Sequence, residues 1–214
     1  KPKAKETFTC LDGHSTVCMR CCFEECPRET PDFFDQCAAA GHPTWPTVAQ
    51  GVANKLVCLE STWDDRMFHT LSIRGFFEAM QPLVHPPLRL AHRWVESAAH
   101  LAYYTKHPDG VLWRDPDSFD APIVYLAFHG RPGQVDSALD EIKERDLCDA
   151  FADFGTAAET LLYFGSCSVL AGKRGQKLGQ ALLEASGCAA IIGYTTDVDW
   201  MESLVVDMMF VHRF

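Results

Sequence analysis

The stretch Ile123–Phe128, IVYLAF, is apolar throughout and ends abruptly in the dipeptide His-Gly. A short apolar run rich in β-branched and aromatic residues predicts a strand that is buried on both faces. The stretch Thr160–Phe164, TLLYF, has the same character and ends in Gly-Ser-Cys. Two strands of this kind favour a parallel sheet with helices on both sides.

Further strands and helices are expected to alternate around these two runs. The expected strands are 55–60, 88–95 and 189–194, and the expected helices are 66–83, 96–105, 137–154, 176–185 and 200–211. A loop rich in Asp and Pro occupies 107–122. The rhythm of strand and helix predicts a three-layer α/β/α domain with a mostly parallel sheet.

The composition changes near Pro43, where a short Cys-rich segment gives way to the α/β pattern. Pro43 and Pro46 disfavour a helix, so the residues around them are expected to be an extended linker. We therefore expect a Cys/His-rich zinc-binding module at 1–43, a linker at 44–54 and the α/β domain at 55–214.

The charge and hydropathy of the chain exclude several classes of function. A formal net charge of −10 argues against nucleic-acid binding, which needs a basic face. No apolar run reaches the length of about 18 residues that a membrane span requires. No apolar stretch follows Lys1–Glu6, so we expect that this segment is not a secretory signal. A cytoplasmic location is expected for the same reason.

Six of the ten cysteines lie within the first 37 residues. Without a secretory signal, such a cluster is more typical of metal ligands than of disulfides. One or two structural Zn²⁺ ions are expected, because a segment this short and polar could hardly fold without them. A disordered, oxidisable tail is the alternative. The candidate ligands are Cys10, His14, Cys18, Cys21, Cys22, Cys26, Cys37 and His42.

Closed four-ligand sites leave no open position for chemistry. The module is therefore expected to bind a protein partner or substrate, or to restrain the domain that follows.

His129 and Cys167 are the candidate catalytic pair. Strands of a parallel sheet present their carboxyl ends at one edge, and neighbouring strands are about 4.8 Å apart. A thiol needs a nearby imidazole to react as thiolate at neutral pH. The backbone N–H groups of Gly130 and Cys167 could stabilise the oxygen of a tetrahedral intermediate. Cys58, Cys148 and Cys188 lack such a histidine and are expected to be structural.

The strings YLAFHG, LYFGSCS and IIGYTTDVDWMES resemble the caspase and CHAT peptidase clan. They are most similar to a bacterial family of uncharacterised caspase-like proteins with FHG, FGSCS and GYTxxVDWxES signatures. The resemblance covers residues 55–214. It implies a caspase-like fold, His129 as base, Cys167 as nucleophile, Gly130 as an oxyanion donor, and a role in bacterial stress or defence.

In this clan the segment at 195–200 helps to form the pocket for the P1 side chain. It offers Asp197 and Asp199, which would favour Arg or Lys at P1. Asp199 has an alternative role as N-cap of the last helix, with Glu202 as its capping-box partner. Gly165 stands where basic-specific members of the clan often carry Asp, which weakens the basic preference.

The leading hypothesis is thus a caspase-like cysteine endopeptidase acting on a protein or peptide. The alternatives are a catalytically silent interaction protein and another acyl-transfer hydrolase that uses the same pair.

Overall fold

The computed structural model describes residues 7–9, 16–18, 55–63, 71–84, 87–115, 121–154 and 160–213. The chain divides into two units, Lys1–Val52 and Ala53–Phe214. In the first unit, β1 (Thr7–Thr9) pairs antiparallel with β2 (Thr16–Cys18). The other elements that the structure describes belong to the second unit.

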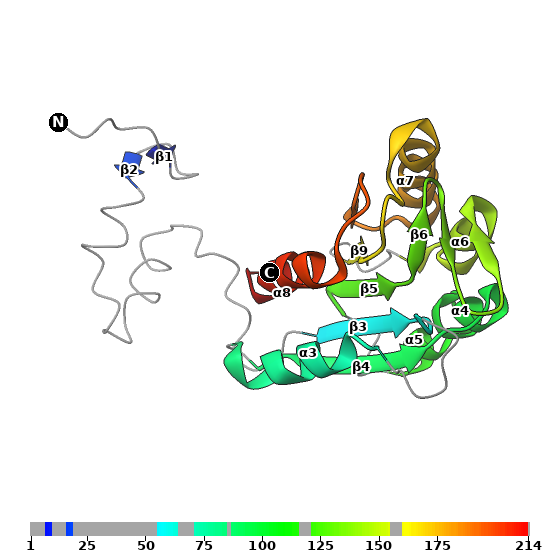
Figure 1. Cartoon of the computed structure of the whole chain (residues 1–214), viewed down its shortest axis with the longest axis horizontal. Coiled ribbons are helices and arrows are strands. Elements are labelled where there is room, and N and C mark those ends of the chain that lie inside the picture. The colour runs from blue at the N-terminus through cyan, green and yellow to red at the C-terminus, as the bar shows by residue number, and fades with distance from the viewer. Residues whose placement is uncertain are drawn as a thin grey trace. The chain divides into compact units, whose positions relative to one another are not determined.

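A five-stranded sheet forms the centre of the second unit (Figure 1). Its strands are β3 (Lys55–Glu60), β4 (Arg89–Trp94), β5 (Ile123–Ala127), β9 (Leu161–Phe164) and β10 (Ala190–Gly193). They lie in the order β10-β9-β5-β3-β4, and each neighbouring pair is parallel. This is an order found in doubly wound α/β folds, and the direction of winding reverses between β3 and β5.

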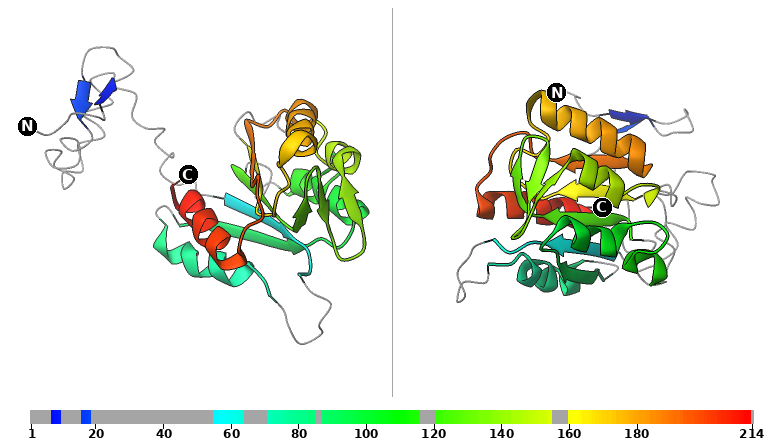
Figure 2. Two further views of the ribbon diagram at one scale, coloured as in Figure 1. Left: turned by 45° about the horizontal axis from the view of Figure 1, so that its top comes forward. Right: turned by 90° about the vertical axis from the view of Figure 1, so that its right-hand side faces the viewer.

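Helices cover both faces of this sheet, with α3 and α8 on one side and α4, α6 and α7 on the other (Figure 2). No helix in the described parts of the chain is long and apolar enough to cross a bilayer. The helices are α3 (Arg74–Met80), the 3-10 turn η1 (Gln81–Leu83), α4 (Ala98–Thr105), α5 (Val111–Arg114), α6 (Glu144–Ala150), α7 (Gly172–Ser186) and α8 (Trp200–Arg213).

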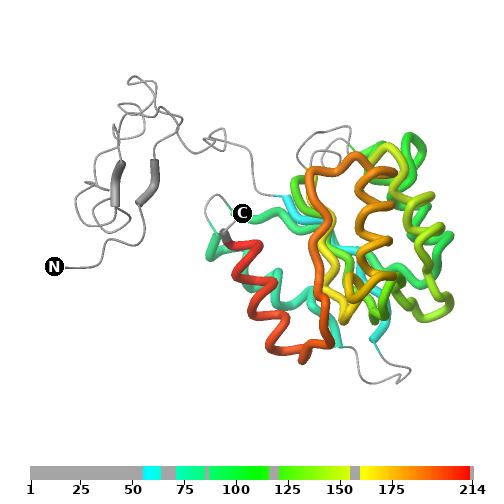
Figure 3. The backbone as a smooth tube through the Cα atoms, turned by 90° about the horizontal axis from the view of Figure 1, so that it is seen from above, coloured from blue at the N-terminus to red at the C-terminus, as the bar shows by residue number. Residues whose placement is uncertain are grey.

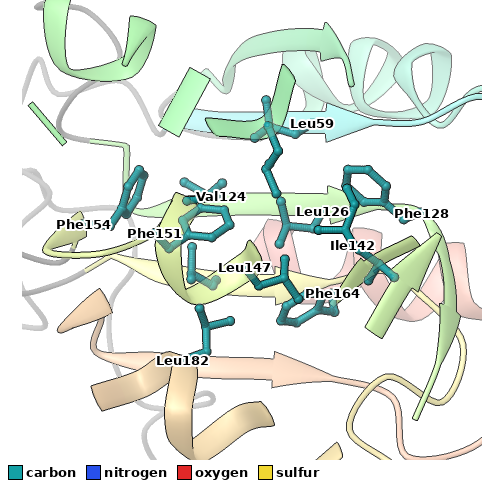
Figure 4. Close-up of a cluster of buried hydrophobic side chains, with 14 of the residues drawn as sticks. Leu59, Val124, Leu126, Phe128, Ile142, Leu147, Phe151, Phe154, Phe164 and Leu182 are labelled. Carbon is teal, nitrogen blue, oxygen red and sulfur yellow. The ribbon is translucent and has the colours of Figure 1, made fainter. Parts of the chain in front are cut away.

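The central strand β5 separates two hydrophobic clusters, because successive side chains of a strand point to opposite faces. Val124 and Leu126 pack with α4, α6 and α7, in the cluster drawn in Figure 4. Ile123 and Tyr125 pack with α3 and α8. All five residues of β5 are at most 3% exposed, as the uniformly apolar sequence predicts. The three-layer α/β/α arrangement expected from the sequence is therefore present.

A second, three-stranded antiparallel sheet was not predicted. It contains β6 (His129–Arg131), β7 (Gln134–Asp136) and β8 (Glu141–Lys143). The expected helix at 137–154 is wrong in its first half, since α6 begins only at Glu144. Val135 and Ile142 lie opposite one another and are completely buried, so the core holds both segments as strands.

Two other helices begin four or more residues away from their expected starts. α3 begins at Arg74, eight residues after the expected start at 66, and residues 71–73 are not helical. The backbone N–H of Ile73 donates to the carboxylate of Glu60 at 3.0 Å, which fixes the chain just before the helix. α7 begins at Gly172, four residues before the expected start at Gln176.

A buried carboxyl group ties α8 to the sheet. Asp207 is 2% exposed and accepts hydrogen bonds from three tyrosine hydroxyls. Tyr163 of β9 and Tyr194 after β10 each donate at 2.5 Å, and Tyr125 of β5 donates to the other oxygen. Burial raises the pKa of Asp207 above its ordinary value, and the three donated bonds offset part of that shift.

The segment that leads into α8 crosses from one face of the sheet to the other. Figure 3 traces the chain from α7 through β10 to α8. Because α7 and α8 pack on opposite faces, the residues at 194–199 pass over the carboxyl edge of the sheet.

We expect Asp207→Ala to lower the free energy of unfolding by about 3 kcal/mol or more, because the buried phenols of Tyr125 and Tyr163 lose their acceptor. Asp207→Asn keeps a carbonyl acceptor of the same shape and should cost less. Urea denaturation followed by tryptophan fluorescence measures both. Equal stability of wild type and the alanine variant would contradict this role of Asp207.

The raised pKa of Asp207 also sets a pH dependence. Between the unfolded pKa of about 3.9 and the higher folded value, the folded chain binds more protons. Stability that depends on this group is therefore fully present below the unfolded pKa and is lost as the pH rises through the folded pKa. The free energy of unfolding of wild type minus that of Asp207→Asn should fall over this interval. A difference that increases with pH would have the wrong sign.

Candidate active site

His129 and Cys167 follow two adjacent strands at the same edge of the parallel sheet. β5 ends two residues before His129, and β9 ends three residues before Cys167. Because β5 and β9 are parallel neighbours, both residues lie at the carboxyl edge. Ligands of doubly wound sheets bind in the crevice at this edge, near the point where the strand order reverses.

Gly130 brings the two segments into direct contact. A Cβ atom at this position would lie 2.2 Å from the carbonyl oxygen of Cys167 and 2.6 Å from Cγ2 of Val169. Both distances are far too short for any side chain, so only glycine fits here. The residue after His129 therefore packs against the peptide of Cys167, and the two candidate catalytic residues are neighbours in space.

The imidazole of His129 is exposed and is oriented by Trp63, which follows β3. Its Nε2 lies 2.8 Å from the carbonyl oxygen of Trp63, and the two rings meet edge to face with centroids 5.2 Å apart. A carbonyl can only accept, so Nε2 carries the proton in this bond. In the neutral ring, Nδ1 is then the basic nitrogen.

Two glutamates fix the segment that carries this carbonyl. Glu60 is completely buried and accepts a hydrogen bond from the indole Nε1 of Trp63 at 2.6 Å. Glu96 accepts from the hydroxyls of Thr62 at 2.8 Å and Ser61 at 3.3 Å. Hydrogen bonds to Glu60 and Glu96 thus hold residues 61–63 and, with them, the Trp63 carbonyl in place.

The thiol of Cys167 is partly buried and faces the segment that follows β10. Its Sγ donates to the carbonyl oxygen of Val198 at 3.5 Å. The backbone N–H of Ser168 donates to the carbonyl of Thr196 at 2.9 Å. The loop after β9 is therefore hydrogen-bonded to the loop after β10 through two consecutive residues, Cys167 and Ser168.

The two aspartates predicted to bind substrate have different partners. Asp197 is exposed and accepts from the hydroxyl of Ser168 at 2.5 Å. Ser168 has a φ of 52°, a left-handed conformation that costs energy in a residue with a side chain. Asp199 accepts from the backbone N–H groups of Met201 at 2.9 Å and Glu202 at 3.2 Å. The capping alternative for Asp199 is thus observed.

A second cluster of reactive side chains was missed by the sequence analysis. Parallel pairing of β3 with β4 places His92 opposite Cys58, and Glu60 follows on the same face of β3. The potential ligand atoms of the three side chains all lie within 4.8 Å of one another. Cys58 therefore has a histidine beside it in the interior of the sheet, away from the strand ends that carry His129 and Cys167. No motif could have found this cluster, because the register of β4 depends on tertiary packing.

Cys58 itself is not suited to nucleophilic chemistry. It is 0% exposed, and burial together with the charge of Glu60 holds the pKa of its thiol well above the usual range. Burial likewise raises the pKa of Cys148 and Cys188. Of the four cysteines in the second unit, Cys167 combines partial exposure with a neighbouring histidine segment.

The predicted zinc ligands of the first unit lie outside the described residues, apart from Cys18 at the end of β2, of which only the backbone is described. Those outside are Cys10, His14, Cys21, Cys22, Cys26, Cys37 and His42.

No protein-family model matches this chain, and no curated protein shows significant similarity to it. The chemistry of the chain's own residues is therefore the basis for assigning a function.

Gly130→Ala tests the contact between the segments that carry His129 and Cys167. The added methyl collides with the Cys167 carbonyl, so we expect the free energy of unfolding to fall by about 1–3 kcal/mol. Gly75→Ala is the matched control, because it adds a methyl to an exposed position of α3 with no atom within 4 Å. It should raise stability by about 0.5–1 kcal/mol. Equal effects of the two substitutions would rule out the close packing at Gly130.

Proposed function

We propose that this chain is a cysteine hydrolase that cleaves peptide bonds, with Cys167 as nucleophile and His129 as general base. The observation that carries the proposal is the packing of Gly130 against the Cys167 peptide at the carboxyl edge of the sheet. It brings into contact the two segments that carry a partly exposed thiol and an exposed imidazole, the two groups that thiol activation requires.

The proposed reaction begins with transfer of the Cys167 proton to Nδ1 of His129. The thiolate forms a bond to the carbonyl carbon of the substrate, and the C=O electron pair moves to oxygen. When this intermediate collapses, the C–N bond breaks and His129 returns its proton to the leaving amine. Water, deprotonated by His129, then attacks the thioester and releases the acid and the free thiol.

Two features support these roles. The bond from Nε2 to the Trp63 carbonyl leaves Nδ1 of His129 as the base and stabilises the imidazolium once it forms. The backbone N–H groups of Gly130 and Cys167 are the proposed donors to the oxyanion. For the reaction to start, the Cys167 thiol must exchange its hydrogen bond with Val198 for one with His129.

A caspase-like fold is the finer part of the proposal. The parallel sheet, its strand order, and a histidine and cysteine after successive strands are all compatible with it. The resemblance of the FHG, FGSCS and GYT segments gives the same assignment. A structural Zn²⁺ in the Cys-rich first unit, and a protein partner bound through it, belong to the proposal as well.

The proposed substrates carry Arg or Lys at P1. The exposed carboxylate of Asp197 accepts a hydrogen bond from Ser168, the residue after the nucleophile, so it lies at the rim of the site. A guanidinium or ammonium group bound there would form a charge-assisted hydrogen bond. Asp199 is less suited, because its carboxylate caps α8.

A catalytically silent interaction protein is the second candidate. α8 exposes Met201, Val205 and Met209 at 51%, 54% and 62%. These residues are spaced four apart and form an apolar stripe on one side of the helix, as partner-binding helices often do.

Turnover of a fluorogenic peptide library varied at P1 tests the proposal. Wild type should cleave after Arg or Lys, and Cys167→Ala or His129→Ala should lower kcat/KM by about a thousandfold or more. Asp197→Asn should reduce the preference for basic P1 by about tenfold.

Cys148→Ala is the matched control, because it removes a partly exposed thiol without a catalytic role. It should retain wild-type turnover. Cleavage after Asp would keep the peptidase and refute the role of Asp197. Turnover that survives Cys167→Ala would refute the catalytic pair, and labelling of Cys167 by electrophilic probes without cleavage would favour another acyl-transfer reaction.

A further inference from the structure

The cluster of Cys58, Glu60 and His92 lies on the α3 side of the sheet. Cys58 and Glu60 are alternate residues of β3, so their side chains point to the same face. His92 pairs with Cys58 across β4 and brings its ring alongside. Cys58 and Glu60 are 0% exposed, and the side chain of His92 is 5% exposed. Three groups with metal-binding atoms are therefore enclosed together.

The three side chains supply a ligand set suited to zinc. Thiolate sulfur, imidazole nitrogen and carboxylate oxygen are the three donors by which proteins bind Zn²⁺. Their atoms lie within 4.8 Å of one another. In a tetrahedral site with bonds of about 2.0–2.3 Å, ligand atoms are roughly 3.3–3.8 Å apart. Nε2 of His92 and Oε2 of Glu60 are 2.6 Å apart. Binding of an ion between them would increase this distance by about 1 Å.

The charge of the cluster also favours a divalent cation. Binding of the ion displaces the proton of the Cys58 thiol, and the resulting thiolate, the carboxylate and a neutral imidazole carry two negative charges, which a divalent ion neutralises. A neutral complex avoids the large cost of a charge enclosed away from water.

Outer partners already hold the carboxylate in the orientation that a ligand needs. Oε1 of Glu60 accepts from the indole of Trp63 at 2.6 Å and from the backbone N–H of Ile73 at 3.0 Å. Oε2 accepts from the hydroxyl of Ser72 at 2.7 Å and faces His92. Hydrogen bonds of this kind orient and tune metal-ligating carboxylates. Oε2 is thus the oxygen directed toward the metal position.

From these observations we propose that Cys58, Glu60 and His92 form a binding site for one Zn²⁺ ion or a similar divalent cation. Water takes the fourth position. The role of the ion is structural, because the cluster is enclosed and its cysteine is not accessible to a substrate. Through Glu60 the ion also restrains Trp63, whose carbonyl orients His129. The site itself does not depend on the proposed peptidase activity.

Metal content of the full-length chain tests the site. We expect Cys58→Ser to hold one equivalent of zinc less than wild type after dialysis, measured by plasma mass spectrometry. Cys188→Ser is the matched control, since it makes the same change at another buried cysteine and should keep the wild-type content. The Cys-rich first unit contributes equally to all three proteins. Equal content in both variants would overturn the proposal.

A second pair of variants and a measurement on the unaltered chain cover the case in which Cys58→Ser does not fold. His92→Asn should also lose one equivalent, whereas His100→Asn on α4 should not. In wild type loaded with ¹¹³Cd²⁺, the ¹¹³Cd NMR spectrum should show the resonance of an ion with a single thiolate ligand. Its chemical shift should lie upfield of the shifts of thiolate-rich sites. Its absence from a folded, loaded chain would overturn the site irrespective of the variants.

Discussion

The buried carboxylate of Glu60 is the constraint on which the carboxyl edge of the sheet depends. A charge enclosed at the end of β3 needs compensating donors, since an unsatisfied carboxylate in the interior costs several kcal/mol. Those donors are the indole of Trp63, the hydroxyl of Ser72, the backbone of Ile73 and the ring of His92. Satisfying one group therefore fixes the segment after β3, the start of α3 and the register with β4.

Asp207 imposes a similar constraint on the same side of the sheet. It lies on α8 and joins that helix to tyrosines of β5 and β9, within the cluster that also contains α3. The opposite face is held mainly by aliphatic and aromatic packing against α4, α6 and α7. The two faces are thus stabilised differently, and the α3 and α8 layer depends more on buried carboxyl groups.

The candidate active site combines segments that follow four strands. Trp63 follows β3, His129 follows β5, Cys167 follows β9, and Val198 lies after β10. In a parallel sheet all of these segments emerge at one edge, so residues far apart in sequence meet without long loops. The cluster of Cys58, Glu60 and His92 shares Glu60 with this network. A change in the interior of β3 can therefore reach His129 through Trp63.

The sequence by itself determined the buried strands at 123–128 and 160–164, the three-layer class of the domain and the candidate pair His129 and Cys167. These follow from local patterns, because uninterrupted apolar runs and strand-end polar residues are visible without knowledge of the fold. Tertiary structure alone decided the small antiparallel sheet, the carbonyl that orients His129, and the pairing of Cys58 with His92. Strand register, and the partners of buried carboxylates, depend on which elements become neighbours after packing, and no local pattern specifies that.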